Sequence, residues 1–411
     1  MKYQITPPSS INGSVNLPAS KSISNRTLIL NALAKIPQLI DNISDSDDTN
    51  TLREALENTT GTVNIGAAGT AMRFLTAYFA ITPGSRVLTG SERMKKRPVK
   101  ILVEALRQLG ASINYVGEEG FPPLSIEGKP LDGGEITING NISSQYISAL
   151  LMIAPTLKNG LSMKITGELI STPYVALTLQ LMETFGVKSK WEGNRIDIPP
   201  QPYISTPYLV EGDWSAASYW YEMAALCPDA EIRLKGLFRN SLQGDSKVAD
   251  IFDGLGVSTF FSENEVALTN TEKKCERFVY NFVNEPDLAQ AVAVTCALLK
   301  IPFHFEGVQS LKIKETDRIE ALRAELGKLG YQLEKSDGTT LTWNGIYSDP
   351  CKEAVIHTYD DHRMAMAFAP ACLKTGTVTI DDPLVNTKSY PAFWLNLQTV
   401  GFMVKKLDKK G

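Results

Sequence analysis

The clearest pattern along the chain is a set of amphipathic helices that each end at a glycine. The segments EALRQLGASI, QLMETFGVKS, DIFDGLGVST, AELGKLGYQL and LNLQTVGFMV close an apolar face with a glycine and then continue into a strand-like stretch. Glycine is the expected residue just after a last helical turn, because it adopts the left-handed backbone conformation freely. These glycines are 76, 70, 74 and 71 residues apart, which indicates an internal repeat. They are Gly110, Gly186, Gly256, Gly330 and Gly401, and Gly61 holds the matching place in a degenerate sixth copy, TLREALENTTGTVNI.

A second type of helix alternates with the first, rich in small residues and nearly uncharged after its first turn. Its copies begin near SKSISNR, GTAMRFL, SSQYISALLM, DWSAASYWYEM, PDLAQAVAVTC and DHRMAMAFAP. The markers Gly69, Ser144, Asp213, Asp287 and Asp361 are 75, 69, 74 and 74 residues apart. A helix that is apolar on nearly all sides should be buried, whereas the glycine-ended helices should lie on the outside.

Short β-rich segments fill the gaps between the helices. They include SVNLP, SINYV, EITING, LSMKITG, RIDIPP, EIRLKG, VSTFF, EVALT, AVIHT and TVTIDD. Each repeat of about 70 residues can therefore supply one layer of helices and one layer of sheet. The predicted fold class is α/β (α+β), with six units in two domains of three, because 411 residues exceed one ordinary core. The Pro-rich link YISTPYLVEGDWS is the expected hinge, and the short first unit, 47 residues from Ser22 to Gly69, should have a smaller local sheet.

Composition narrows the classes of partner and compartment. A net charge of −4 without a basic stripe argues against nucleic acid as a partner. The start MKYQITPPSS has no apolar signal-peptide core, and no apolar run reaches the roughly 20 residues of a membrane span, so we expect a cytoplasmic protein with no membrane partner. Five cysteines without a CxxC pair and three scattered histidines predict free thiols and no metal site.

The stretch LPASKSISNRTLIL, residues 17–30, combines a serine-rich turn, the start of an apolar helix and two cations, Lys21 and Arg26. The unpaired N–H groups of a first helical turn and the helix dipole favour an anion at that end. A serine-capped surface helix with two solvated charges is the alternative for this segment alone.

The other buried helices also begin with polar residues, which the helix interior could not hold. These are Gly69 with Thr70, Ser143 with Ser144 and Gln145, Asp213, Asp287, and Asp361 with His362 and Arg363. The amphipathic helices add RMKKRP with Arg97 and Pro98, STPY from Ser171 to Tyr174, and KETDR from Lys314 to Arg318. Pro98 and Pro173 suit a first helical position, and Asp317 with Glu320 can form a capping box, which leaves Lys314 and Glu315 in the loop and Arg318 in the first turn. Taken singly, RMKKRP and KETDR also fit a solvated charged surface.

The cations at these helix starts predict a site for small anionic metabolites. Guanidinium groups bind carboxylates and phosphates in a bidentate manner, so a pair of phosphorylated or carboxylated ligands is expected. No zinc ligand set, P-loop or Rossmann glycine pattern occurs, so metal hydrolysis, P-loop chemistry and dinucleotide redox are not supported. The candidates for proton transfer are Lys21, Asp287, Glu315 and His362.

The ordered motifs of the chain resemble those of the 5-enolpyruvylshikimate-3-phosphate synthase family, within the enolpyruvyl transferase superfamily. The resemblance extends from about Leu17 to Pro391 and rests on SKSISNR, DSDD, AAGTAMR, RMKKRP, GNISSQY, STPY, EGDWSAASY, RNSLQGD, KETDR, DHRMAM and SYP. It implies an inside-out α/β barrel of six βαβαββ-type units, three per domain. The implied domains are residues 20–210, and 1–19 together with 211–411, with the active site in the cleft between them.

The resemblance also implies a reaction and its residues. Members transfer the carboxyvinyl group of phosphoenolpyruvate to the 5-hydroxyl of shikimate 3-phosphate and release phosphate, in the biosynthesis of chorismate and the aromatic amino acids. No cofactor or metal is implied, and we expect a monomer. Proton transfer is expected from Lys21, Asp287 and Glu315, with their individual roles left open. The implied shikimate 3-phosphate set is Lys21, Ser22, Arg26, Ser143, Ser144, Gln145, Ser171, Tyr174, Asp287, Ser310 and Lys314. The implied phosphoenolpyruvate set is Lys21, Gly69, Arg97, Gln145, Arg318, Arg363 and Lys388.

The chain departs from the family pattern in three places, and two other functions compete. Ser310 and Ala67 stand where the family usually has asparagine, and the segment before Asn64 is short. A sister enzyme that transfers enolpyruvyl to a UDP-amino sugar commonly uses a cysteine in its first half, but here no cysteine precedes Cys227. A non-catalytic sensor of phospho-metabolites would tolerate loss of the acid and base groups, whereas Lys21, Asp287 and Glu315 are all present.

Overall fold

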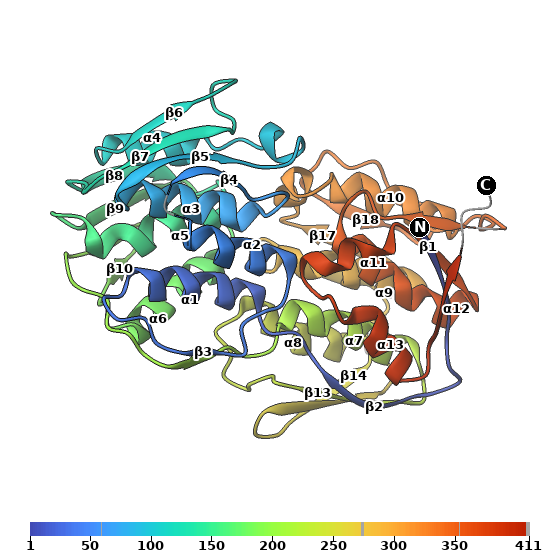
Figure 1. Ribbon diagram of the computed structural model, residues 1–411. Coiled ribbons are helices and arrows are strands. Elements are labelled where there is room, and N and C mark those ends of the chain that lie inside the picture. The colour runs from blue at the N-terminus through green and yellow to red at the C-terminus, as the bar shows by residue number, and fades with distance from the viewer. Residues whose placement is uncertain (59, 273–274, 353, 408–411) are drawn as a thin grey trace. The chain divides into compact units, whose positions relative to one another are not determined.

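The computed structural model describes residues 1–58, 60–272, 275–352 and 354–407. The chain forms two compact units. We call Ser20–Val210 the first domain, and Met1–Ala19 with Glu211–Gly411 the second domain. Both contain helices and strands, so the predicted α/β class is confirmed (Figure 1).

The first domain contains the described helices α1 to α6 and three sheets. The helices are α1 (Lys21–Leu33), α2 (Asp47–Leu56), α3 (Gly69–Ile81), α4 (Lys100–Gln108), α5 (Ser144–Ile153) and α6 (Thr172–Thr184). One sheet has the order β4 (Gly61–Asn64), β5 (Gly84–Thr89), β7 (Leu124–Gly128), β6 (Ser112–Tyr115). Another has the order β8 (Gly134–Asn139), β9 (Leu161–Thr166), β11 (Arg195–Ile198), β10 (Lys190–Glu192), and the smallest pairs β3 (Ile40–Asp41) with β12 (Tyr208–Leu209).

The second domain contains the described helices α7 to α13 and three further sheets. The helices are α7 (Trp214–Leu226), α8 (Val248–Gly254), α9 (Ala289–Leu298), α10 (Arg318–Lys328), α11 (His362–Phe368), α12 (Cys372–Thr375) and α13 (Phe393–Thr399). One sheet has the strand order β2 (Ile11–Asn16), β13 (Ala230–Lys235), β15 (Glu265–Asn270), β14 (Val257–Phe261). The next has the order β19 (Val355–His357), β20 (Val378–Asp381), β1 (Lys2–Thr6), β21 (Met403–Leu407). The third has the order β16 (Phe278–Asn281), β17 (Phe303–Glu306), β18 (Leu341–Trp343).

One pairing pattern recurs in these sheets. Each four-stranded sheet starts with a parallel pair and continues with two antiparallel pairs, as in β8–β9 followed by β9–β11 and β11–β10. The β16–β17–β18 sheet has the parallel pair and one antiparallel pair, and the described β3–β12 sheet has only the parallel pair. Since β3 belongs to the short first unit, the expected smaller local sheet is confirmed.

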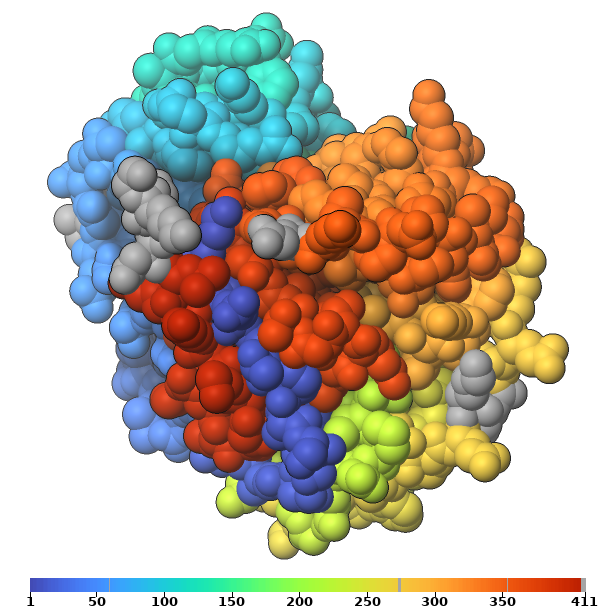
Figure 2. All heavy atoms as spheres, turned by 90° about the vertical axis from the view of Figure 1, so that its right-hand side faces the viewer, coloured from blue at the N-terminus to red at the C-terminus, as the bar shows by residue number. Residues whose placement is uncertain are grey.

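The first 16 residues supply strands to two sheets of the second domain. β2 pairs in parallel with β13 from Ile11–Ala230 to Asn16–Lys235, and β1 lies between β20 and β21. Figure 2 shows this N-terminal segment in blue between red segments from the end of the chain. The start of the chain is therefore an integral part of the second domain's sheets.

The small-residue helices form the interior and the sheets cover them. All residues of α9 and α11 are buried, and α3, α5 and α7 are nearly as buried, which confirms the prediction for five of the six copies. The sixth copy, α1, has seven buried residues out of 13, so the prediction holds only in part there. Strands such as β13 alternate strictly between buried and exposed residues, as expected for sheets with one solvated face. None of the described helices is long and apolar enough to cross a membrane.

The glycine-ended helices stop as predicted at five of six places. Gly110, Gly186, Gly256, Gly330 and Gly401 each lie two residues after a helix and have φ between 82° and 101°. The prediction for Gly61 was wrong, because α2 already ends at Leu56 and Gly61 is the first residue of β4. Its φ of 88° belongs to the entry of a strand.

Glu222 is a buried acid in the middle of α7, and we expect Glu222→Gln to stabilise the fold at neutral pH. Glu222 is 0% exposed, and neither of its carboxyl oxygens has a hydrogen-bond partner among the described residues. Burial therefore raises the pKa of Glu222 well above its ordinary value of 4.5. The carboxyl group of Glu222 has a higher pKa in the folded protein than in the unfolded protein. It therefore does not oppose folding when the pH is below the pKa of the unfolded state, and it destabilises the fold increasingly as the pH rises above that value. Glutamine carries no charge, so at pH 7 the glutamine variant should have the higher free energy of unfolding.

Urea unfolding of both proteins at pH 4.5 and pH 7 checks this expectation. The gain should shrink at the lower pH, because much of the glutamate is then protonated in the unfolded state as well. Glu231→Gln, on the exposed face of β13, is the matched control and should change the unfolding free energy little. An equal effect of Glu222→Gln at both pH values would contradict the expectation.

Candidate active site

In the first domain, Arg26 connects the helix that carries it to two others. Its Nε donates to Thr178 Oγ1 on α6 at 2.7 Å, and Nη2 donates to Ser148 Oγ on α5 at 3.2 Å. Arg26 is only 2% exposed, and burial lowers the pKa of its guanidinium to about 10. Its hydrogen-bond partners among the described residues are neutral oxygens, including the backbone carbonyls of Ser22 at 2.9 Å and Tyr174 at 3.4 Å. A buried cation held by neutral groups favours a bound anion nearby.

The start of α1 adds a second cation to this region. Ser20 caps the helix by accepting a hydrogen bond from Ile23 N at 3.4 Å, which leaves Lys21 as the first helical residue. Lys21 Nζ lies 3.4 Å from Asp48 Oδ2, in the first turn of α2. Asp48 belongs to the DSDD motif, to which the sequence alone assigned no role.

Ser171 has an unusual backbone conformation at the start of α6. It is 7% exposed and has φ 54° and ψ 39°, a left-handed conformation that residues other than glycine, asparagine and aspartate rarely adopt. Such outliers concentrate at functional sites. The role of Ser171 in substrate binding stays a prediction.

The starts of α3 and α5 are joined by side chains, with Arg97 beside them. Ser143 caps α5 by accepting from Gln145 N at 3.3 Å, and Gln145 Nε2 donates to Thr70 Oγ1 at 3.2 Å. The Arg97 guanidinium packs directly on Gly69, and a β-carbon added at Gly69 would lie 2.7 Å from Arg97 Nη1. Arg97 Nε is buried and has no hydrogen-bond partner among the described residues. The guanidinium is therefore well suited to a carboxylate or phosphate ligand.

Because Gly69 supports Arg97, we expect Gly69→Ala to weaken binding of an anionic substrate at Arg97 by about tenfold. The added methyl group must displace the guanidinium, and a charge-assisted hydrogen bond contributes about 1.5 to 3 kcal/mol. Arg97→Ala should weaken binding at least as much. The matched control is Gly327→Ala in α10, where a β-carbon meets nothing within 4 Å. Titration with a small phosphorylated carboxylate measures the effect, and unchanged affinity in Gly69→Ala would contradict it.

In the second domain, Arg318 lies at the centre of a network that we call the Arg318 network. Its Nε donates to Asp361 Oδ2 at 2.7 Å, Nη1 donates to Asp287 Oδ1 at 3.1 Å, and Nη2 donates to Glu315 Oε2 at 3.0 Å. Arg318 is 1% exposed. Burial by itself lowers the pKa of Arg318, but the carboxylates of Asp361, Glu315 and Asp287 outweigh it and raise that pKa. Three carboxylates therefore fix the direction of one guanidinium.

Three further cations complete the Arg318 network. Arg363 Nη2 lies 2.9 Å from Asp287 Oδ2, and Lys314 Nζ lies 3.6 Å from Asp287 Oδ1. Lys388 Nζ lies 2.6 Å from Glu315 Oε1. Loss of hydration lowers the pKa of Lys314, although Asp287 opposes the shift. Asp287 therefore contacts three cations, and Glu315 contacts two.

Local structure explains how these side chains meet. Asp361 caps α11 by accepting from Arg363 N at 2.9 Å, while the same carboxylate binds Arg318. Asp317 caps α10 by accepting from Glu320 N at 3.3 Å, so Arg318 is the first helical residue, as predicted. The Glu320 carboxylate accepts from Arg323 at 2.6 Å and not from Asp317 N, so only the Asp317 half of the predicted capping box is formed among the described residues.

Two predictions of helix starts need correction. Asp287 lies in the 3₁₀ turn Pro286–Leu288, immediately before α9, because Pro286 starts a tighter turn there. Pro98 precedes α4 by two residues, with Val99 at the N-cap, whereas Pro173 is the second residue of α6.

Four residues of these clusters were not among the predicted site residues. They are Asp48, Tyr219, Asp245 and Asp361. Tyr219 Oη accepts from Arg363 Nη1 at 3.4 Å, and burial raises the pKa of Tyr219 to about 12. Burial and the nearby charge of Asp287 raise the pKa of Asp245 to about 7. The signal for Asp361 was its N-cap position, and Tyr219 and Asp245 lie within the SAASY and QGD motifs.

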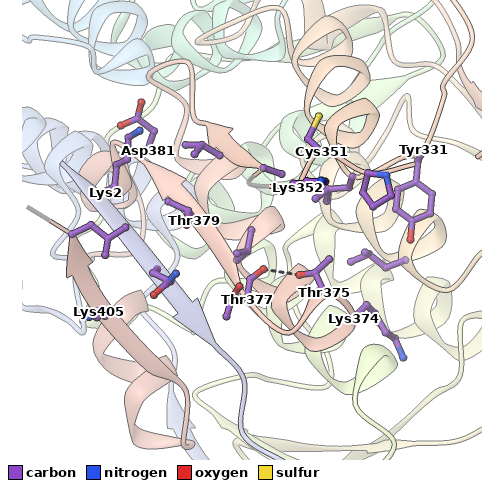
Figure 3. Close-up of a pocket in the computed structure, with 18 of the residues that line it drawn as sticks. Lys2, Tyr331, Cys351, Lys352, Lys374, Thr375, Thr377, Thr379, Asp381 and Lys405 are labelled. Atoms are coloured by element: carbon purple, nitrogen blue, oxygen red, sulfur yellow. Dashed lines mark hydrogen bonds between the residues drawn. The ribbon is translucent and has the colours of Figure 1, made fainter. Parts of the chain in front are cut away.

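Other residues lie outside these hydrogen-bonded clusters. Ser310 is half-buried in the 3₁₀ turn Gln309–Ile313, and its side chain makes no hydrogen bond with another described residue. His362 is 1% exposed and borders the Arg318 network, with its Nδ1 3.7 Å from Asp361 Oδ1. Figure 3 shows a surface pocket of the second domain around Lys2, Tyr331, Lys374 and Asp381, and none of its lining residues is a predicted site residue. Among the described residues, no group of histidine, cysteine, aspartate and glutamate side chains could hold a metal ion.

Comparison with known proteins identifies the family to which these clusters belong. The sequence profile of EPSP synthase (3-phosphoshikimate 1-carboxyvinyltransferase) matches residues 5–64 and 57–397. The chain belongs to the EPSP synthase family.

Individual relatives agree with this assignment. The chain is 55% identical over 406 residues to a 3-phosphoshikimate 1-carboxyvinyltransferase of Bacteroides fragilis, covering 98% of this chain and 99% of the relative. It is 39% identical over 415 residues to the enzyme of that name from Vibrio cholerae, covering 93% and 96%. The solved structure of EPSP synthase from Acinetobacter baumannii has a similar fold, with a TM-score of 0.75 at 22% identity, covering 98% of this chain and 100% of that one.

Proposed function

We propose that the regions around Arg26 and Arg97 in the first domain and the Arg318 network carry out one enolpyruvyl transfer. The chain is a transferase of the EPSP synthase family. It transfers the enolpyruvyl group of phosphoenolpyruvate to the 5-hydroxyl of shikimate 3-phosphate and releases phosphate, a step in aromatic amino acid biosynthesis. The observation that carries the residue assignment is the Arg318 network, where the carboxylates of Asp287 and Glu315 lie among four cations.

The chemistry requires both acids and bases. The substrate oxygen forms a bond to C2 of phosphoenolpyruvate while its proton passes to a base and the methylene carbon gains a proton from an acid. Phosphate then leaves as the new methyl group gives up a proton, which restores the double bond. Positioned acid and base groups typically contribute about 100- to 10,000-fold to such steps. Asp287, Glu315 and Lys21 are the proposed groups, with Asp287 favoured for the hydroxyl.

The clusters divide between the two substrates according to their surroundings. Arg97 next to Gly69, with Arg318, Arg363 and Lys388, supplies the concentration of cations that the carboxylate and phosphate of phosphoenolpyruvate need. We assign to shikimate 3-phosphate the region of Arg26, where hydroxyls and helix starts gather. The proposed set there is Lys21, Ser22, Arg26, Ser143, Ser144, Gln145, Ser171 and Tyr174, with Asp287, Ser310 and Lys314 from the second domain.

The finer architecture is part of the same proposal. The recurring sheet pattern supports an inside-out α/β barrel of six units, three per domain. In this proposal, the protein is a cytoplasmic monomer that needs no cofactor.

A phosphate-release assay tests the function. The purified chain should release phosphate when both substrates are present, and none when either is omitted. Release from phosphoenolpyruvate alone would indicate a phosphatase, and release with a UDP-amino sugar in place of shikimate 3-phosphate would indicate the sister transferase. Binding of both substrates without release would favour a sensor.

A further inference from the structure

A second hydrogen-bonded connection ties α10 to the segment that carries Asp361. Glu325, about two turns after Arg318, is 0% exposed. Its Oε1 accepts from Tyr359 Oη at 2.6 Å, and its Oε2 accepts from His357 N at 3.1 Å. Lys328 Nζ donates to Glu325 Oε2 at 2.6 Å and to Val355 O at 2.9 Å. The second half of α10 is therefore attached to β19 and to the turn that follows it.

That turn has a backbone that needs support. Tyr359 and Asp360 have φ of 54° and 57°, two successive left-handed residues of which neither is glycine. Tyr359 is 40% exposed, so packing of its ring alone holds it weakly, and its hydroxyl group is attached to the buried Glu325 carboxylate. The turn ends at Asp361, whose N donates to Thr358 O at 2.9 Å.

The end of the turn determines the geometry of the Arg318 network. Asp361 is 0% exposed, and its carboxylate holds both Arg318 and the backbone N–H of Arg363 in the first turn of α11. The Arg363 side chain in turn binds Asp287. A shift of the turn would therefore move two guanidinium groups at once.

We propose that Glu325 and Tyr359 are positioning residues for the phosphoenolpyruvate half of the site. They hold the 358–361 turn so that Asp361 directs the Arg318 guanidinium and α11 presents Arg363. Neither residue belongs to the proposed substrate contacts; they act through Asp361. The inference rests on the proposed function in one respect, the assignment of phosphoenolpyruvate to these two arginines.

Steady-state kinetics of Tyr359→Phe test the proposal, because this change removes one hydroxyl and keeps the ring. KM for phosphoenolpyruvate should rise about tenfold, as expected for weakening of one charge-assisted contact, while KM for shikimate 3-phosphate stays within about twofold. Glu325→Gln should have a similar effect, and the double variant should be far from additive. The matched control is Tyr221→Phe, which removes a hydroxyl bonded to Thr259 Oγ1 at 3.1 Å elsewhere in the domain and should leave both KM values unchanged.

Hydrogen exchange provides a readout that does not depend on turnover. In Tyr359→Phe, amides of residues 358–364, including Arg363 N, should exchange faster, while those of α7 keep their protection. Unchanged exchange in this segment would overturn the inference, as would equal KM increases for both substrates or a lower melting temperature with unchanged kinetics. If the wild-type chain releases no phosphate, the proposed function fails, and the exchange result still decides whether Glu325 and Tyr359 hold the turn.

Discussion

Glu315→Gln and Asp287→Asn should each reduce turnover by about 100- to 10,000-fold while both substrates still bind. Glu315 lies 2.6 Å from Lys388 and 3.0 Å from Arg318, so it is placed within the proposed phosphoenolpyruvate cations. Asp287 contacts Arg363, Arg318 and Lys314. Each substitution keeps the size of the side chain and removes its ability to accept a proton, so the loss should appear in kcat.

Glu320→Gln is the matched control for these two variants. Glu320 lies in the first turn of α10, close in sequence to Glu315, but its carboxylate pairs with exposed Arg323. The turnover of the Glu320→Gln variant should remain within about twofold of that of the wild-type chain, since exposed ion pairs contribute little to stability. Near-normal kcat in Glu315→Gln or Asp287→Asn at saturating substrates would contradict a role in proton transfer and would leave that residue as a binding or structural group.

Arg318→Ala is expected to cause the largest loss of stability, about 3 to 5 kcal/mol in the free energy of unfolding. The arginine is buried and compensates Asp361, Asp287 and Glu315 together. Its removal leaves the fully buried Asp361 without its principal cation, and an uncompensated buried charge is strongly destabilising. Urea unfolding followed by circular dichroism measures the change.

Arg323→Ala on the same helix is the control for Arg318→Ala. Arg323 pairs with Glu320 at 2.6 Å, but both side chains are more than 40% exposed. Its removal should cost about 1 kcal/mol or less. Comparable losses for the two arginine variants would contradict the view that Arg318 neutralises a buried acidic cluster.

The repeated elements could be predicted from sequence because their signals are local. A glycine that follows an apolar helical face by two residues predicts a left-handed backbone conformation, as found at Gly110 and Gly330. This prediction does not depend on which part of the protein the helix packs against. The uncharged run in PDLAQAVAVTC likewise reports burial of α9 on every side. Gly61 has the same φ as the true caps, but it belongs to a strand, because the helix before it ends early.

The contacts within the site could not be predicted, because they depend on pairing between distant segments. Asp213 and Asp361 both occupy N-cap positions, and nothing local distinguishes them. Only the fold shows that Asp361 also binds Arg318, 43 residues away in the chain. The contact of Arg97 with Gly69 and the hydrogen bond of Tyr359 to Glu325 likewise join segments that are distant in the sequence.

The most direct test of the central claim is NMR spectroscopy of the purified chain mixed with phosphoenolpyruvate and shikimate 3-phosphate. The phosphorus spectrum should show the phosphoenolpyruvate resonance replaced by inorganic phosphate, while the phosphate of the shikimate ring remains esterified. The proton spectrum should show new vinyl signals from an enol ether whose oxygen is bonded to C5 of the ring. Formation of inorganic phosphate together with pyruvate, or no change in either spectrum, would contradict the assignment of an enolpyruvyl transfer to this chain.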